Sequence, residues 1–238
     1  MNLVQKQIYG NKKNNLIGSV IAAYHLSDGV DSKNGYNGTV GSSVAFASGV
    51  NGNAAVFNAT SNSYISIPDT NDLSFTDGTN DLPFSIKFNF KTASIGQTAF
   101  VFAKEKNSDT SNDEYCLVIY NNAFYFRLLD KSVIFNGIGI ITSLSGLSAN
   151  TFYNIIYTYD GSKSASGLKC YINNSLRSST AEIRGTYTGM KNGTYPFKLG
   201  TNSSNEIPFN GTLDELYIFN KELNNSERTF LQSSYYPF

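Results

Sequence analysis

The heptapeptide SIKFNFK, residues 85–91, alternates apolar and polar side chains. Successive side chains of a β-strand point to opposite faces, so this stretch predicts a strand. Its three apolar residues, Ile86, Phe88 and Phe90, would then share one face, with Lys87, Asn89 and Lys91 on the other. The run NAFYFRLLD, residues 122–130, predicts a second strand in the same way. The runs at 152–160 and 211–220 read as further long strands.

Turn signals separate these runs. The breakers between strand-like stretches are Asp28-Gly29, Asn51-Gly52, Asp77-Gly78, Asn121-Asn122, Asp160-Gly161 and Asn173-Asn174. Asn-Gly and Asp-Gly dipeptides accept the positive φ that tight hairpins require. One helix is expected near the C-terminus, over residues 226–232, with Asn224 or Asn225 as its N-cap. Short alternating strands with turn signals between them predict an all-β sandwich.

The composition narrows the function classes. Among 238 residues, 18 are Lys or Arg and 18 are Asp or Glu. This balance gives no electrostatic reason to expect nucleic acid or an anionic membrane as a partner. No apolar run approaches the roughly 20 residues of a membrane-spanning helix. Cys116 and Cys170 are far apart and form no zinc pattern, so we expect two buried thiols.

The polar N-terminus predicts a division of the chain. Residues 1–15 are expected to form an arm for assembly or anchoring, and residues 16–238 to form one domain. Leu3, Val4, Ile8 and Tyr9 would supply the apolar contacts of the arm, either with another copy of the chain or with another protein. The first ten residues lack the apolar core of a signal peptide, which favours synthesis in the cytoplasm of a host cell.

Seven segments, taken in order, carry a resemblance to a known family. They include Gly49–Phe57 (GVNGNAAVF), Tyr64–Pro68 (YISIP), Phe152–Gly161 (FYNIIYTYDG) and Phe209–Leu223 (FNGTLDELYIFNKEL), and the others are 23–39, 84–86 and 168–173. Together, over about residues 20–232, they resemble the LamG-like domains of the concanavalin A-like lectin/glucanase superfamily. The resemblance implies a two-sheet antiparallel jelly-roll sandwich with one short C-terminal helix.

The same resemblance leaves two functions open, because this fold hosts lectins, hydrolases and virion proteins alike. The first is a non-enzymatic structural or decoration protein of a bacteriophage capsid or tail, bound to other virion proteins or to itself and presenting a lectin-like platform. The second is a carbohydrate-binding lectin module of a bacterial surface or secreted protein. In both, surface glycans are candidate partners, and the chain would reside in the virion or at the bacterial cell surface.

Enzymatic activity is not expected. Glycosidases of this superfamily carry spaced carboxylates on one strand, and no such motif occurs here. Asp113-Glu114 and Asp214-Glu215 are adjacent pairs, whose side chains should point to opposite faces of a strand. The single histidine, His25, has no second histidine or nucleophile motif beside it, which favours a structural role.

A calcium site is the chemical prediction that the sequence supports best. Asp31, Asn34 and Asn37 lie in an oxygen-rich loop with glycines, and Ca²⁺ prefers such oxygen ligands. By resemblance to related domains, Asp214 would meet this loop and complete the site. The alternative is that Asp31 and Asn34 cap turns and that Asp214 bonds to loop amides.

The tyrosines offer a second kind of site. The chain has no Trp, so any stacking surface for sugars would use Tyr or Phe. The candidates are Tyr115, Tyr120, Tyr125, Tyr187 and Tyr195, which could line the outside of a sheet. The alternative is ordinary packing within the sandwich.

Overall fold

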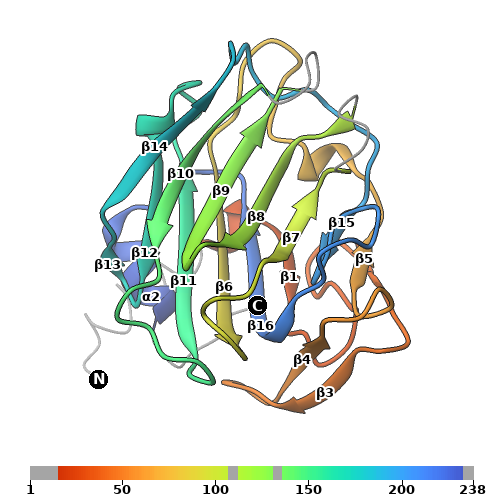
Figure 1. The fold of residues 1–238 in the computed structure, drawn as a ribbon. Helices are drawn as coiled ribbons and strands as arrows, with labels where there is room; N and C mark the ends of the chain where they lie inside the picture. Colours follow the sequence, from red (N-terminus) through yellow and green to blue (C-terminus); the bar gives the residue numbers. More distant parts are fainter. Residues whose placement is uncertain (1–15, 107–111, 131–135, 233–238) are drawn as a thin grey trace, which may run out of the picture.

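A computed structural model describes residues 16–106, 112–130 and 136–232 of the chain. In these residues, two antiparallel sheets lie face to face (Figure 1). Sheet A consists, in spatial order, of β13 (Ser175–Leu176), β12 (Leu168–Ile172), β11 (Tyr153–Tyr159), β6 (Phe84–Thr92), β16 (Asn210–Phe219), β4 (Asn53–Asn58) and β3 (Ala45–Ser48), with β1 (Val20–Tyr24) also pairing with β16.

Sheet B covers the other side of the core. It consists, in spatial order, of β14 (Ser179–Arg184), β10 (Gly137–Ser143), β9 (Ala123–Leu129), β8 (Tyr115–Tyr120), β7 (Ala99–Lys104), β15 (Phe197–Leu199), β5 (Ile65–Ile67) and β2 (Thr39–Val40). The described residues also include the short helices η1 (Asn71–Leu73) and η3 (Ala165–Gly167), the helix α2 (Asn225–Gln232) and a helical stretch at residues 16–19. The predicted all-β sandwich with one C-terminal helix is confirmed.

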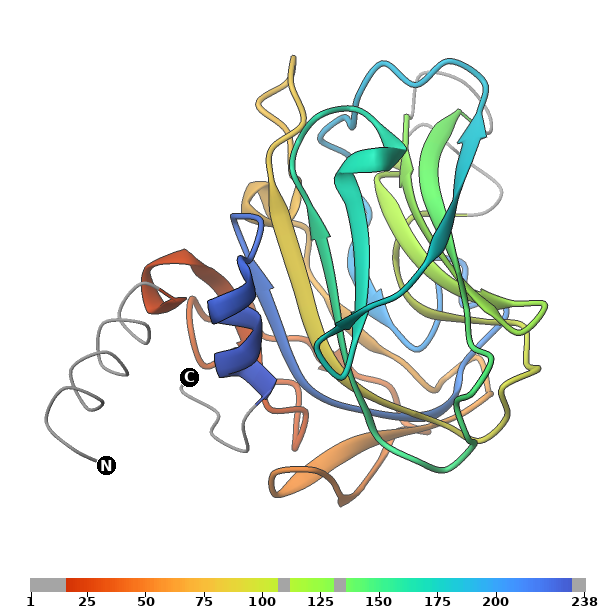
Figure 2. The same ribbon diagram turned by 90° about the vertical axis from the view of Figure 1, so that its left-hand side faces the viewer.

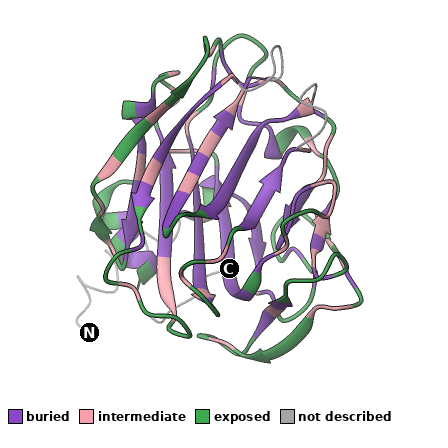
Figure 3. Ribbon diagram, viewed as in Figure 1, coloured by how far each residue is buried: buried purple, intermediate pink, exposed green. Residues whose placement is uncertain are grey.

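The inward faces of the two sheets form the main core. Ile86, Phe88 and Phe90 of β6 lie in it, as do Phe124 and Phe126 of β9. Both alternation patterns therefore predicted the correct inward face. Fully burying each such side chain contributes about 1.5–3 kcal/mol, which fixes which face turns inward. Figure 3 shows buried residues filling the strands of both sheets, with exposed residues on loops and on β3.

The hairpin turns also follow the sequence. Asn121 and Asn122 join β8 to β9, and their φ angles are 47° and 57°. Asn173 and Asn174 join β12 to β13 with φ angles of 50° and 62°. Positive φ at both central residues is the geometry of a type I′ turn, whose twist matches the flanking strands.

The polar face of β6 differs from the expectation of an exposed face. Lys87 and Asn89 are buried, at 0% and 3% exposure. For Lys87 the cause is a second apolar layer on the outside of sheet A, where α2 packs (Figure 2) and where the centre of the Tyr217 ring lies 5.0 Å from the Lys87 amine. Phe230 and Leu231 of α2 join Tyr217 and Phe219 of β16 in this layer. The outer face of sheet A is therefore an interior surface over part of its area.

Helix α2 is held at its start by a capping box. The Asn224 side-chain oxygen accepts a hydrogen bond from the backbone N–H of Glu227 at 3.1 Å. The Glu227 carboxylate accepts one in return from the backbone N–H of Asn224 at 2.9 Å. This reciprocal pair satisfies two amides of the helix end and identifies Asn224 as the cap.

Both cysteines are free and buried, as expected, Cys116 in β8 and Cys170 in β12. Within the described ranges, no helix has the length and apolar character needed to cross a bilayer. The predicted arm, with Leu3, Val4, Ile8 and Tyr9, lies outside the described residues. Its role and the division at residue 15 stay predictions.

Candidate functional site

The outer face of sheet B brings together residues from strands far apart in the sequence. Antiparallel pairing aligns one outward-facing row across seven strands. Its members are Ser66, Lys198, Ala103, Cys116, Arg127, Gly139 and Glu182. The side chains at the middle of this row are small, except for Arg127. The Arg127 side chain is therefore flanked by smaller residues, Cys116 and Gly139, on the neighbouring strands.

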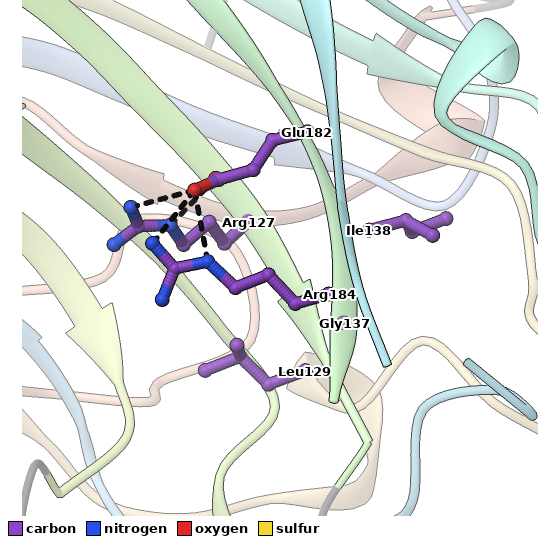
Figure 4. Close-up of a pocket in the computed structure, with 6 residues that line it drawn as sticks. All are labelled: Arg127, Leu129, Gly137, Ile138, Glu182 and Arg184. Atoms are coloured by element: carbon purple, nitrogen blue, oxygen red, sulfur yellow. Dashed lines mark hydrogen bonds and ion pairs between the residues drawn. The ribbon is translucent and has the colours of Figure 1, made fainter. Parts of the chain in front are cut away.

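Arg127, Glu182 and Arg184 converge at the β14 edge of this face (Figure 4). Arg127 Nε and Nη2 lie 2.8 and 3.0 Å from the two Glu182 carboxylate oxygens, which is a bidentate pair. Arg184 Nε and Nη2 also reach Glu182 Oε1, at 2.9 and 2.8 Å. Burial would raise the pKa of Glu182, but the bonds and charges of the two arginines hold it below its usual value. Two guanidiniums thus share one carboxylate, leaving an excess positive charge.

Two glycines of β10 lie very close to the backbone of β9 beside these arginines. A Cβ on Gly139 would lie 2.6 Å from the backbone oxygen of Phe126, and one on Gly137 would lie 2.6 Å from that of Leu128. Contacts this short are not tolerated, so the backbone would have to shift for any other residue. Gly137, Arg127, Glu182 and Arg184 line a small pocket together with Leu129 and Ile138.

Two tyrosines extend the site along the same face. The Arg127 guanidinium carbon lies 4.9 Å from the centre of the Tyr125 ring. The Tyr125 ring in turn packs against the Tyr120 ring, with centres 5.8 Å apart and planes at 62°. Tyr120 is 46% exposed. The result is a strip with an exposed aromatic ring at one end and guanidinium and carboxylate groups at the other.

The structure separates the five candidate tyrosines. Tyr120 and Tyr125 lie on the outer face of sheet B, as the stacking hypothesis requires. Tyr115 is fully buried in the core, which is the ordinary packing of the alternative. Tyr187 is partly buried and its hydroxyl donates to Asp81 at 2.7 Å. Tyr195 is half-buried in the segment before β15. The arginines and Glu182 were not identified from the sequence, because only the strand register brings them together.

The predicted calcium ligands form two separate groups. Asp31 accepts four backbone hydrogen bonds of 2.8–3.0 Å, from Ala23, Lys33, Asn34 and Tyr36. The Asn37 side-chain oxygen accepts from the Asp31 amide, and the Asn34 side chain donates to the Ile21 oxygen. Asp214 instead accepts from the amides of Val50 and Asn51. Among the described residues no hydrogen bond joins Asp214 to the Asp31 loop.

These contacts match the turn-capping alternative, because four amide donors already occupy the lone pairs of the Asp31 carboxylate. Asp214 Oδ1 is buried and accepts no hydrogen bond. Of the two groups of predicted ligands, only the Asp214 group therefore has a carboxylate oxygen free to bind a cation. No three His, Cys, Asp or Glu side chains gather as a metal-binding group in the described part of the chain.

Calcium binding stays a prediction that chelation tests. A cation bound only to the native state stabilises it, so EDTA should lower the melting temperature and added Ca²⁺ should restore it. The measurement is thermal unfolding followed by circular dichroism. An unchanged melting temperature in EDTA would leave the capping contacts as the whole role of these residues.

Asp214 and Glu215 depart from the expectation that adjacent carboxylates point to opposite faces. β16 contains a bulge here, with Glu215 at φ 51°. Asn51 consequently contacts both carboxylates, through its amide to Asp214 and its side chain to Glu215. Burial raises the pKa of Asp214 to about 6, although the Val50 amide opposes the rise. The prediction of opposite faces is wrong at this pair because the bulge inserts an extra residue.

This carboxylate pair is nevertheless closed to substrate. Both residues are 0% exposed. Glu215 is occupied by His25 Nδ1 at 3.1 Å, by Asn51 and by the Tyr217 hydroxyl. The buried Lys87 amine donates to the Glu215 backbone oxygen at 3.1 Å, and burial lowers the pKa of that amine to about 7. The cluster therefore joins β1, β6 and the Asn51 loop to the bulge, which is the structural role expected of His25.

Comparisons with solved structures agree with the sandwich. The binding domain of Paraclostridial Mosquitocidal Protein 1 superposes with a TM-score of 0.69 at 19% identity, over 92% of this chain and 53% of that one. Domain 4 of AbnA, a GH43 extracellular arabinanase of Geobacillus stearothermophilus in complex with arabinotriose, gives 0.65 at 19% identity, over 90% and 98%. The ligand binding domain of botulinum neurotoxin serotype D in complex with N-acetylneuraminic acid gives 0.61 at 17%, over 93% and 52%.

The chain thus spans about half the length of two of these structures and almost all of the AbnA domain. At sequence identities of 17–19%, these superpositions show a shared fold and no more. No curated protein sequence matches the chain. A laminin G-type family, described as the concanavalin A-like lectin/glucanases superfamily, matches residues 58–227, which is most of the chain. The chain therefore belongs to the concanavalin A-like lectin/glucanase superfamily, as its sequence motifs predicted.

Proposed function

We propose that the chain is a non-catalytic carbohydrate-binding module whose binding site is the outer face of sheet B. The observation that carries this proposal is the strip formed by Tyr120, Tyr125, Arg127, Glu182 and Arg184. A sugar ring stacks on an aromatic face, and its hydroxyls both donate and accept hydrogen bonds. The strip offers an exposed ring beside a guanidinium and carboxylate cluster. The glycan complexes of the AbnA domain and of the serotype D binding domain support the same class of ligand.

The charges favour an acidic glycan. Glu182 neutralises one of two arginines, and Arg184 remains 42% exposed at its side chain. Burial, reinforced by the Asp113 charge, raises the pKa of the neighbouring Glu105 to about 8, which reduces the negative charge of that carboxyl at neutral pH. A sugar carboxylate can therefore pair with the exposed Arg184 guanidinium in the manner that suits this side chain.

The preference for acidic sugars can be tested directly. N-acetylneuraminic acid and glucuronic acid should bind more tightly than glucose, and Arg184→Ala should weaken the acidic sugars by about tenfold. Titrations followed by two-dimensional NMR measure both effects. Lys169→Ala is the matched control, because Lys169 pairs with Glu222 on sheet A at a similar exposure. Equal binding of glucose, or equal loss in the two variants, would refute the assignment.

Two kinds of protein could carry this binding site. One shallow strip supports only weak binding, near millimolar or about −4 kcal/mol, so useful affinity requires many copies side by side. This favours the chain as a bacteriophage capsid or tail decoration protein that binds other virion proteins or copies of itself. The alternative is a lectin module of a bacterial surface. Glycan arrays probed with monomer and with native assembly distinguish them, since tight binding by the monomer supports the dedicated lectin.

A further inference from the structure

A second cavity lies away from sheet B, at the end of β16 beside the segment that contains η1. Its volume is about 300 Å³. Asn71 and Asp72 of η1, Phe75, Thr76 and Leu82 line it, together with Asn220, which follows β16. None of the residues of the strip described above takes part. The cavity is therefore an independent site.

One wall of the cavity is apolar and rigid. Phe75 stacks on Phe84 of β6, with ring centres 3.9 Å apart and planes 6° from parallel. Leu82, which also lines the cavity, has 40% of its surface exposed, whereas most large apolar side chains among the described residues are buried. Pro83 continues the same wall. An exposed apolar side chain and a stacked aromatic ring in the lining suit the carbon face of a small ring.

The polar residues that line the cavity carry hydrogen-bonding groups that are not used within the described residues. Asp72 Oδ2 accepts the Tyr36 hydroxyl at 2.5 Å, which leaves Oδ1 open. Asn71 accepts from the Asn192 side chain through its oxygen, which leaves its side-chain NH₂ open. The Asn220 side-chain amide is exposed and bonds to no described residue. The cavity thus presents two amide donors, one carboxylate acceptor and one amide acceptor.

Size and charge select the ligand. A volume of about 300 Å³ is at the lower end for ligand pockets, enough for one sugar ring and too small for a branched glycan. Asp72 is the one charged side chain among the residues that line the cavity, so anions are repelled. Neighbouring hydroxyls of a neutral sugar can donate to Asp72 Oδ1 while they accept from Asn71 and Asn220.

We infer that this cavity binds one terminal, neutral sugar residue. It is a second site, with a preference opposite to that of the sheet B face. It goes beyond the proposed function, since either site can exist without the other. An acidic sugar probes the sheet B face and a neutral sugar probes the cavity. Failure of the proposed function can therefore be distinguished from failure of this inference.

The test is an NMR titration of the isotope-labelled full chain with the methyl glycosides of glucose, galactose, mannose and arabinose. At least one should produce saturable shifts at the amides of Thr76, Leu82 and Asn220. Asn220→Ala and Asp72→Asn should each weaken that binding about tenfold or more, because each removes or neutralises a hydrogen-bonding group. Asp72→Asn retains an acceptor for Tyr36, and Asn220 is exposed, so both variants should fold.

Asn53→Ala is the matched control, because Asn53 is an exposed asparagine on β4 away from the cavity. It should leave the affinity for the chosen glycoside unchanged. The inference is overturned if no glycoside gives saturable shifts at the cavity amides. It is equally overturned if Asn220→Ala binds as tightly as Asn53→Ala.

Discussion

Glu114→Ala should lower the free energy of unfolding by about 3 kcal/mol or more, because it leaves a buried cation without its main partner. Glu114 and Lys104 are both 0% exposed and form an ion pair. Glu114 Oε1 also accepts hydrogen bonds from the Ser74 hydroxyl at 3.1 Å and the Gly193 amide at 2.9 Å. Asp69, which lies 2.7 Å from the Lys104 amine and is partly exposed, compensates only in part. Urea unfolding followed by circular dichroism measures the loss.

Glu222→Ala is the control for this effect. Glu222 pairs with Lys169 at 2.8 Å, and both side chains are more than a third exposed. Exposed pairs contribute at most about 1 kcal/mol. The double variant Lys104→Met, Glu114→Met should recover most of the stability, since an apolar pair needs no desolvation of charge. Equal losses for Glu114→Ala and Glu222→Ala would show that the buried pair is not a main support of the fold.

The second large effect is a dependence of stability on pH that originates at Glu105. Burial, reinforced by the Asp113 charge, raises the pKa of Glu105 to about 8 from the ordinary 4.5. Below pH 4.5 both the folded and unfolded chains are protonated at this carboxyl. Between pH 4.5 and 8 the unfolded chain releases the proton first, so stability falls as pH rises through this window. One pKa unit corresponds to about 1.4 kcal/mol.

Glu105→Gln removes this dependence, because glutamine resembles the protonated acid at every pH. Wild type and variant should have similar stability at pH 4, and the variant should be more stable by about 2–4 kcal/mol at pH 9. Lys87 changes stability in the opposite direction above pH 7, but it does so equally in both proteins and cancels in the difference. Denaturant unfolding at a series of pH values measures the difference in the free energy of unfolding between the two proteins. If the free energies of unfolding of the two proteins changed with pH in parallel, Glu105 would not be the origin of the pH dependence.

Much of the fold was predictable because it depends on local patterns. Alternation along β6 and β9 identified the inward face of each strand, and paired asparagines marked two turns that the structure shows to be of type I′. The helix α2 was predicted with Asn224 or Asn225 as its cap, and the structure identifies Asn224. Each of these features is a property of a short segment, so neighbouring residues contain the information.

The bulge at Glu215 and the burial of Lys87 were not predictable in this way. Alternation predicts a regular strand, and one inserted residue reverses the direction of the next side chain. Lys87 is buried because α2 and its neighbours cover the outside of sheet A, a packing that no local pattern along β6 specifies. Two acidic residues therefore meet at Asn51, where the sequence suggested separation.

The sequence by itself determined the sandwich, its inward faces, its hairpins and its helix, because periodicity and turn chemistry act within a few residues. Only the tertiary structure decided the two candidate binding sites. Arg127 and Glu182 meet through the register of β9, β10 and β14, and Asp72 and Asn220 meet where η1 lies beside the end of β16. Sites of this kind are made by long-range pairing of strands, and one sequence carries no direct signal for which distant residues will become neighbours.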